Sequence, residues 1–160
     1  MKNSNRTRKA KYLLVICSLL MGASCEEHAP CTSEGDHTTV ETQTFFDLNT
    51  PYAWVQNVDD NETTLNLIIQ NQQDYEKYVG IREDTLRPVI DFESNILLAG
   101  RIIHPSCGFI ENQNVTKKCD DYYYTVILAN GACGAVVRIN YFVITTKVSS
   151  EVKFDIQFEN

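Results

Sequence analysis

The amino-acid sequence predicts a mainly β protein, at the margin of the α+β class: an antiparallel β-sandwich or a partly open barrel with one short helix near residues 72–79. Four runs rich in Val, Ile, Thr, Tyr and Phe, which pack well on a pleated surface, follow one another with short turns between them. Because the turns are short, we expect a meander of successive strands. These four strands are expected at 96–103, 109–116, 122–128 and 135–146.

Three further strands are expected from alternating apolar residues, at 52–57, 63–70 and 152–158. In the last of them, apolar side chains occupy every second position and polar side chains occupy the others. This alternation predicts a half-buried antiparallel strand with one face in solvent.

The helix is predicted by capping residues and periodicity together. Asn71 can cap its N-terminus, Asp74 lies near its positive end, and Gly80 can end it. Apolar residues at i, i+3 and i+4 form a stripe that would face the sheet: Tyr75, Tyr78 and Val79. We interpret these tyrosines as core residues rather than as a ligand site.

The N-terminal residues predict export. A basic segment, 1–12, precedes an apolar run, 13–21, which is too short to span a bilayer as a mature helix. Small residues and then Cys25 follow, in an order that resembles a bacterial lipobox, although Gly22 stands where that motif prefers Leu. The resemblance implies a signal peptide at 1–24 and lipidation of Cys25, with an ordinary secreted protein as the alternative.

Residues 25–44 have no periodicity and few apolar side chains, which predicts a flexible tether before a single β-rich domain at 45–160. Several acyl chains, palmitate among them, would hold the protein stably on a membrane. The expected location is the bacterial envelope, on the periplasmic or the surface side of the outer membrane. Glu26 and Glu27 weakly resemble the surface-export signal of some Bacteroidetes lipoproteins.

The charge of the chain disfavours nucleic-acid binding. The whole sequence carries 14 Lys and Arg against 21 Asp and Glu, a net charge of −7. Five of the basic residues lie before residue 25, so removal of that segment leaves nine, and a net charge of −12. A chain this acidic repels phosphate backbones.

Four cysteines remain after the expected lipidation, and outside the cytoplasm disulfides are their default state. Cys107 and Cys119 stand at opposite ends of one expected strand, roughly 30 Å apart, whereas a disulfide needs Cα atoms within about 7 Å. Cys119 and Cys133 meet the same objection. The turn that begins at Asn130 would return the chain toward Cys107, which favours a Cys107–Cys133 disulfide. Cys119 would then be free or bonded to Cys31.

Few residues suggest catalysis or metal binding. His104, three residues before Cys107, could join the cysteines in a zinc site, but the spacings match no common zinc module. Three acidic pairs have the character of solvated turn residues: Asp59-Asp60, Glu83-Asp84 and Asp120-Asp121. We therefore expect no metal, no cofactor and no enzyme activity.

The tyrosine run 122–124 would place Tyr122 and Tyr124 on one sheet face and Tyr123 on the other. If the outer face were exposed, Tyr123 could contact a sugar or a protein. Tyrosine is also simply a good strand residue, and we favour that interpretation.

Two adjoining segments carry a family resemblance. Residues 88–92 (PVIDF) and 95–100 (NILLAG), with the Tyr-Phe pair at 141–142, resemble a motif of small bacterial lipoproteins related to the C-terminal domain of the protease-complex stability (PrcB-like) family. The similarity covers about residues 65–158. It implies a β-rich, non-catalytic domain, in the namesake an accessory that stabilises a protease complex, and it implies no binding residue here. Residues shared with the cysteine-bearing members are Cys107, Gly108, Gly131 and Cys133.

From the sequence we expect a lipid-anchored envelope protein that binds a protein partner, without catalysis of its own. The alternative is an envelope glycan or small-ligand binder, and a hydrolase is the third candidate. Exposed aromatic side chains in a concave face would favour the glycan binder, whereas an apolar patch or an open sheet edge would favour the protein binder. A deep pocket with convergent polar groups would favour the enzyme.

Overall fold

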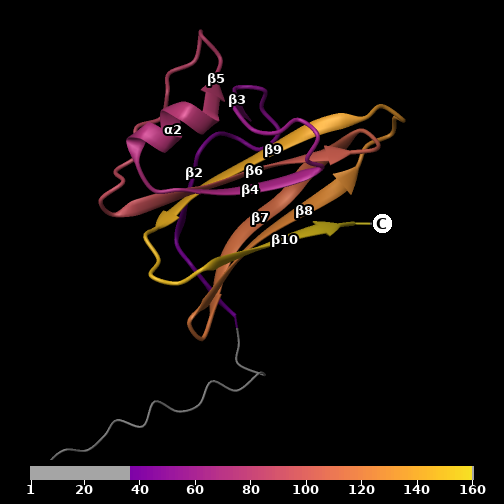
Figure 1. Ribbon diagram of the computed structural model, residues 1–160. Coiled ribbons are helices and arrows are strands. Elements are labelled where there is room, and N and C mark those ends of the chain that lie inside the picture. Colours follow the sequence, from indigo (N-terminus) through magenta and orange to yellow (C-terminus); the bar gives the residue numbers. More distant parts are fainter. Residues whose placement is uncertain (1–36, 160) are drawn as a thin grey trace, which may run out of the picture. The chain divides into compact units, whose positions relative to one another are not determined.

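The computed structural model describes residues 37–159, and within them the chain forms three sheets and one helix (Figure 1). Sheet A has the strand order β1-β7-β8-β10, sheet B the order β2-β9-β6-β4, and sheet C the order β3-β5. The elements are β1 (Thr38–Thr39), β2 (Thr42–Thr44), β3 (Ala53–Val55), β4 (Thr64–Ile69), α2 (Gln72–Tyr78), β5 (Val79–Ile81), β6 (Asn95–His104), β7 (Gly108–Lys118), β8 (Asp121–Asn130), β9 (Val137–Thr146) and β10 (Val152–Phe158).

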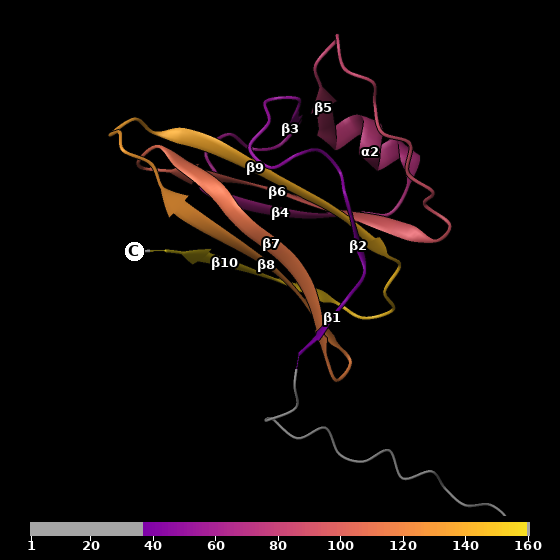
Figure 2. The same cartoon turned by 180° about the vertical axis from the view of Figure 1, so that it is seen from behind.

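Sheet B is the middle layer. Sheet A covers one of its faces, called the inner face below, while α2 and sheet C lie over the other, the outer face (Figures 1 and 2). The predicted mainly β, sandwich-like fold is confirmed, and its sheets are not closed into a barrel. The seven predicted strands are all present, with bounds within a few residues of those expected.

The two central strands of sheet B, β6 and β9, are buried on both faces, and their sequences show why. In β6 an almost unbroken apolar run places Ile96, Leu98 and Ile102 on the inner face. The residues between them, Leu97 and Ala99, pack on the outer face beneath the helix. A strand that is apolar at consecutive positions can satisfy both of its faces only as the middle layer of a structure.

The inner core includes two fully buried tyrosines, Tyr124 and Tyr141, whose pKa values burial raises. Each hydroxyl has a partner: Tyr124 donates to Gln113 Oε1 at 2.6 Å, and Tyr141 donates to Asn66 Oδ1 at 2.5 Å. The Tyr141 ring lies directly over Gly100, its partner in the β6–β9 ladder. A Cβ atom at Gly100 would come within 2.2 Å of that ring, so the inner face requires glycine there.

The helix follows its predicted start. The Asn71 side chain accepts a hydrogen bond from the Asp74 N–H at 2.8 Å, which caps the first turn. Tyr75 and Val79 are buried against the outer face, as the apolar stripe predicts. The helix ends at Tyr78, close to the predicted end, but Gly80 does not cap it: Gly80 belongs to β5, where the Trp54 ring covers it.

The expected meander was wrong at two connections. β7 and β8 form a hairpin, but the chain changes sheet between β6 and β7 and again between β8 and β9. The connection after Asn130 is therefore a crossing between sheets and not a type I′ hairpin turn, and Gly131 has a negative φ. A tight hairpin turn joins two neighbouring strands of one sheet. Strands that belong to the two facing sheets of a sandwich need a connection that crosses from one sheet to the other.

The expected antiparallel pairing of residues 152–158 was also wrong. Their half-buried alternation is as predicted, but β10 pairs with β8 in parallel, with Val152 opposite Tyr122. The physical reason is the intervening strand: β9 runs back along sheet B, so the chain re-enters sheet A in the direction of β8. An edge strand shows the same one-sided alternation in either direction.

The last part of the expected tether is also structured. Residues 38–39 form β1 and pair with β7, and residues 42–44 form β2 and pair with β9. This stretch is rich in Thr, which is a good strand residue. Its apolar and polar residues do not alternate clearly, so no strand was predicted there. The ordered part of the chain thus begins before residue 45.

Candidate functional site

The outer face of sheet B changes from apolar to polar along its length. Beneath the helix, the ladder between β6 and β9 contains the apolar pairs Leu97–Ile144 and Ala99–Phe142. The next outward pair is Arg101–Asn140, and Arg138 follows. Here α2 and β3 no longer cover the face, and the side chains on it are polar.

Arg101 is 3% exposed, so its charge needs partners inside the protein. Its guanidinium donates to the Asp60 carboxylate at 2.9 Å and to the Asp59 carbonyl oxygen at 2.7 Å. Its buried Nε–H has no acceptor among the described residues. Asp60 also lies 3.4 Å from Arg138, whose side chain is 57% exposed. Of the acidic pair Asp59-Asp60, which was expected to be merely solvated, the Asp60 carboxylate therefore binds two arginines.

Trp54 stands beside these arginines with 41% of its surface exposed. It is paired with Gly80 in sheet C, and a Cβ atom at Gly80 would come within 2.3 Å of the indole ring. The ring therefore lies against the backbone of β5. The neighbouring Val55 N–H donates to Asn140 Oδ1 at 3.0 Å, which ties β3 to β9. One side of the indole is held by the backbone, and β3 is held by sheet B.

Two adjoining hollows border Trp54, and both also contact Arg138 and Asn140. The first, of about 530 Å³, extends to Phe109. The second, of about 340 Å³, extends to Arg101. We call the two together the Trp54 groove. Further side chains that border it are Asn49, Gln56, Asn57 and Asp60.

Two asparagines support the rims of the Trp54 groove, and both adopt positive φ angles. The Asn49 amide makes a double hydrogen bond with the backbone of Ile110, at 2.7 and 2.6 Å. The Asn57 amide donates to the Lys77 carbonyl oxygen at the end of α2, at 2.6 Å. The loops on either side of β3 are therefore fastened to elements of the scaffold.

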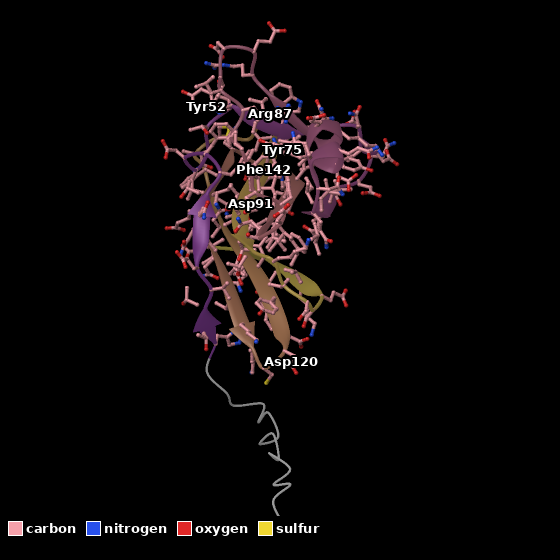
Figure 3. All side chains as sticks on the ribbon, turned by 90° about the vertical axis from the view of Figure 1, so that its left-hand side faces the viewer. Tyr52, Tyr75, Arg87, Asp91, Asp120 and Phe142 are labelled. Atoms are coloured by element: carbon pink, nitrogen blue, oxygen red, sulfur yellow. A yellow bond between two sulfur atoms is a disulfide. The ribbon has the colours of Figure 1, made fainter. Side chains whose placement is uncertain are left out.

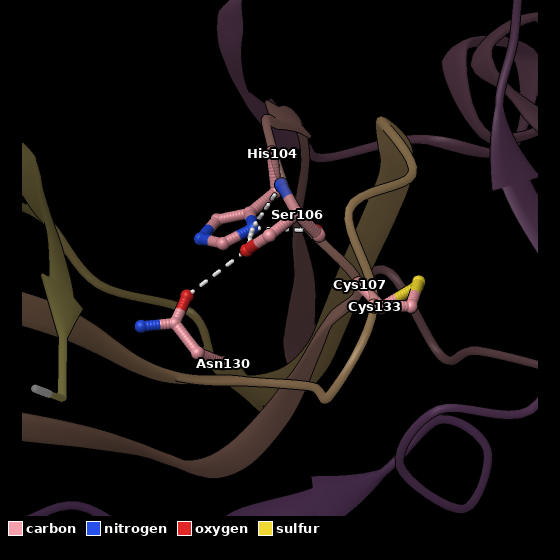
Figure 4. Close-up of a disulfide and its surroundings, with 5 residues drawn as sticks. All are labelled: His104, Ser106, Cys107, Asn130 and Cys133. Carbon is pink, nitrogen blue, oxygen red and sulfur yellow. Dashed lines mark hydrogen bonds between the residues drawn. A yellow bond between two sulfur atoms is a disulfide. The ribbon is translucent and has the colours of Figure 1, made fainter.

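The disulfide predicted between Cys107 and Cys133 is present, with Cα atoms 5.2 Å apart (Figure 4). It joins the two connections that cross between the sheets. Backbone hydrogen bonds run beside it, from Cys107 N–H to the Cys133 oxygen and from Gly131 N–H to the Cys107 oxygen. The prediction was right because both crossings lie at the same end of the sandwich, although the turn invoked for it is absent.

His104 lies next to this disulfide and is buried. Its Nδ1 lies 2.7 Å from the Ser106 carbonyl oxygen, 3.2 Å from the Ser106 hydroxyl and 3.3 Å from the Ser106 backbone nitrogen. The Ser106 hydroxyl donates to Asn130 Oδ1 at 3.1 Å (Figure 4). The cluster holds the loop in place.

Of the other cysteines for which a role was predicted, the structure describes only Cys119. Cys119 lies in the β7–β8 turn and is disulfide-bonded, which removes the alternative of a free thiol. Its partner lies outside the described residues. Cys31 and the expected lipidation site, Cys25, also lie outside them. In the described part of the chain, no group of three or more His, Cys, Asp or Glu side chains is placed to hold a metal ion.

Two of the predicted acidic pairs form exposed ion pairs at turns. Asp84 is bound by the Arg82 guanidinium, which lowers the pKa of that carboxyl. Asp121 lies 2.6 Å from Lys153 on β10, and this hydrogen bond lowers the pKa of Asp121. The pairs are far from one another and fasten local structure; Figure 3 shows Asp120 at the end of the molecule opposite to Arg87.

The tyrosine run divides between faces as predicted. Tyr124 is in the inner core, and Tyr122 packs partly against it. Tyr123 lies on the outer side of sheet A, with its ring 5.4 Å from His37 and 5.3 Å from the Lys153 ammonium group. It is half-buried by these neighbours, which favours the strand-packing interpretation.

A second surface feature is the loop at 82–92, which stands at the top of Figure 1. Leu86 and Val89 are 92% and 98% exposed. The residues between them are tied down: Arg87 donates to the Val79 carbonyl oxygen and lies over the Tyr75 ring, and the Pro88 oxygen accepts from the Tyr75 hydroxyl at 3.0 Å (Figure 3). Two aliphatic side chains therefore project into water from an anchored loop.

Comparison of the chain with protein-family models, with characterised proteins and with solved structures found no match. The resemblance to the PrcB-like domain therefore stays a prediction. Its Ile90-Asp91-Phe92 element has a structural role here, because Asp91 accepts from the Glu93 N–H at 3.0 Å and so shapes the turn into β6. No helix within the described residues is long and apolar enough to cross a membrane.

The functional candidates that sequence reasoning missed are Trp54, Arg101, Arg138 and the two loop aliphatics. A signal for the arginines was present: Arg101 interrupts an otherwise apolar run, and Arg138 and Asn140 alternate with apolar residues at the start of β9. Charged side chains are rarely buried unless they are paired. A charge inside a strand that is otherwise buried on both faces therefore indicates a position where one face is no longer covered by apolar side chains. The exposure of Trp54, Leu86 and Val89 depends on distant contacts and had no local signal.

Proposed function

We propose that this chain is a lipid-anchored, non-catalytic binding protein of the bacterial envelope, and that it holds a protein partner through the loop at 82–92. The observation that carries the proposal is the exposure of Leu86 and Val89, at 92% and 98%. Exposed aliphatic side chains gain free energy when a partner removes them from water.

The construction of the loop supports this proposal. Arg87, Pro88 and buried Ile90 fasten the loop to the helix and the outer core, so little conformational entropy is lost when a partner binds. The loop also lies at the opposite end of the molecule from β1, where the described chain begins (Figures 1 and 2).

The resemblance to the PrcB-like family gives this proposal a more specific form, in which the partner belongs to a protease complex. The expected lipidation at Cys25 gives it a location, on the periplasmic or the surface side of the outer membrane. The experiment below tests the protease form of the proposal.

The test is site-directed photo-crosslinking. A crosslinking amino acid replaces exposed Glu83, and the protein is irradiated in an extract of its own envelope. We expect one reproducible protein adduct, identified by mass spectrometry, that is lost when Leu86→Asp/Val89→Asp is introduced. The matched control is Val136→Asp, which changes another exposed aliphatic residue at a distant loop. An adduct that survives the double substitution would contradict the proposed surface, and a captured non-protease would remove its protease form.

A further inference from the structure

We propose that the Trp54 groove is a saccharide-binding site, and that its ligand is a sugar bearing a carboxylate group, such as a uronic acid. This site is separate from the loop at 82–92 and does not depend on the protein-binding proposal. Four features of the groove carry the inference: an aromatic platform, a local excess of positive charge, an unpartnered buried donor and surrounding amide groups.

The platform is the Trp54 indole. Because Gly80 has no side chain, the ring lies against the β5 backbone, and the remainder of the ring borders both hollows. The face of an aromatic ring is electron-rich, and the C–H groups on one side of a sugar ring carry partial positive charge, so the two stack. The attachment of the indole to the scaffold means that the platform exists before a ligand arrives.

The charge of the groove is opposite to that of the chain. Arg101 and Arg138 face a single carboxylate, Asp60, in a protein whose net charge is −7. The more exposed arginine, Arg138, is only loosely paired with Asp60, at 3.4 Å. A guanidinium presents several N–H donors in one plane and binds carboxylates in a bidentate manner. The groove can therefore pair one ligand carboxylate with Arg138.

The buried Nε–H of Arg101 is the third feature. Leaving a buried donor without an acceptor is unfavourable, and such groups are rare in folded proteins. Arg101 borders the second hollow, and its Nε–H has no acceptor within residues 37–159. An oxygen held in this hollow, from a ligand or from an ordered water that the ligand contacts, would supply one.

The size and the remaining lining of the groove suit a saccharide. Hollows of about 530 and 340 Å³ are in the range of small-ligand sites and are large enough for one or two sugar rings. Three amide groups on its rim make no hydrogen bond within residues 37–159 and could bind ring hydroxyls: Gln56 Oε1, Asn57 Oδ1 and Asn140 Nδ2. The side chains of an apolar peptide would offer no acceptor to Arg138 or to the buried Arg101 Nε–H.

The test uses the intrinsic fluorescence of Trp54, the only tryptophan in the sequence, so the signal reports on this groove without a label. The purified protein is titrated with oligogalacturonate, hyaluronate oligosaccharides and sialyllactose, each against its neutral methyl ester. We expect a saturable change in the tryptophan spectrum with at least one acidic sugar. We expect binding of its methyl ester to be at least about tenfold weaker, because the charged hydrogen bond is lost.

Variants locate the site. Arg138→Met should weaken binding at least about tenfold and Arg138→Lys less, because lysine keeps the charge but not the planar pair of donors. Trp54→Ala, measured by calorimetry, should abolish binding. The matched control is Lys153→Met, which removes an exposed positive charge from sheet A and should leave the affinity unchanged. Leu86→Asp/Val89→Asp should also leave it unchanged, which separates this site from the proposed protein-binding loop.

Two results would overturn the inference. If no acidic sugar changes the tryptophan spectrum or gives heat in calorimetry, the groove is not a site of this class. If a sugar and its methyl ester bind equally, or Arg138→Met binds as the parent does, the carboxylate does not pair with Arg138. The melting temperature of each variant is measured alongside, so that loss of folding is not taken for loss of binding.

Discussion

The two faces of sheet B are built from the same strands but are covered differently. Along β6 the inner face is closed by sheet A, from Ile96 at one end of the strand to His104 at the other. The outer face is covered by the helix over Leu97 and Ala99, and then opens at Arg101 into the Trp54 groove. Alternate residues of a strand point to opposite faces, so one sequence encodes both surfaces.

A glycine lies beneath an aromatic ring on each side of this comparison. On the inner face, Tyr141 lies over Gly100, and it is fully buried with its hydroxyl paired. On the outer side, Trp54 lies over Gly80, and it is substantially exposed. The same local packing device thus serves stability in one place and presents an aromatic surface in the other. What differs is whether another layer covers the ring.

Leu98→Ala tests the closed face and has the largest expected effect. Leu98 is fully buried, so its truncation leaves a cavity and should reduce the free energy of unfolding by about 2–5 kcal/mol. Arg138→Met, on the open face, should change it by less than about 0.5 kcal/mol. Urea unfolding of both variants measures the difference. Similar losses would mean that the open face is also a structural core.

Removal of the Cys107–Cys133 disulfide tests the end of the molecule where the groove opens. The bridge spans a sequence separation of 26 residues, and its loss in Cys107→Ser/Cys133→Ser should reduce stability by about 2–4 kcal/mol. Because Gly108 and Phe109 border the Trp54 groove, we also expect a change in the Trp54 emission spectrum. Thermal unfolding with and without reductant is the measurement, and parent protein that melts at the same temperature in both would contradict it.

The two glycine–aromatic pairs allow a matched substitution. Gly100→Ala should be destabilising by about 1–3 kcal/mol, because the buried Tyr141 ring has no room to move. Gly80→Ala should cost less stability and should instead shift the Trp54 emission, because that ring can swing into solvent. Chemical unfolding and fluorescence together report both effects. Equal destabilisation would show that Trp54 is held as firmly as Tyr141.

The smallest expected effect is a pH dependence from sheet A. The hydrogen bond from Lys153 lowers the pKa of Asp121 below its ordinary value of 3.8, so the folded state favours the ionised carboxylate. The stabilisation is present above this ordinary value and is lost as the pH falls through the lower folded-state value. Asp121→Asn should therefore be slightly less stable than the parent at pH 7, and the difference should vanish in acid. A constant difference across that range would contradict the ion pair.

Much of the fold could be predicted because the signals are local. The apolar run of β6, the Asn71 cap and the alternation of β10 each act within a few residues, and each identified its element. The Cys107–Cys133 pairing was also within reach, since it needed the loops to meet and not a particular turn. The direction of β10 was not, because an edge strand has the same alternation whether its neighbour is parallel or antiparallel.

The candidate site could not be assembled from the sequence. Trp54, Arg101 and Arg138 are far apart in the chain and share no motif. Arg101 gave a sign as a charge in an apolar run, and Arg138 gave another as a charge that alternates with apolar residues at the start of β9. Arg101 pairs with Asp60 and borders a hollow because of the position of β3 over β9. The hydrogen bond from the Val55 N–H to Asn140 Oδ1 secures that position.

The sequence by itself determined where seven of the strands lie, where the helix begins and which cysteines at one end of the sandwich pair. Propensity, capping and side-chain period act over distances of a few residues, so these properties are written locally. Tertiary structure alone decided which sheet each strand joins, which face of sheet B stays open and which aromatic residue reaches the surface. Those outcomes depend on how far one layer extends over another, and that extent depends on contacts between residues distant in the chain.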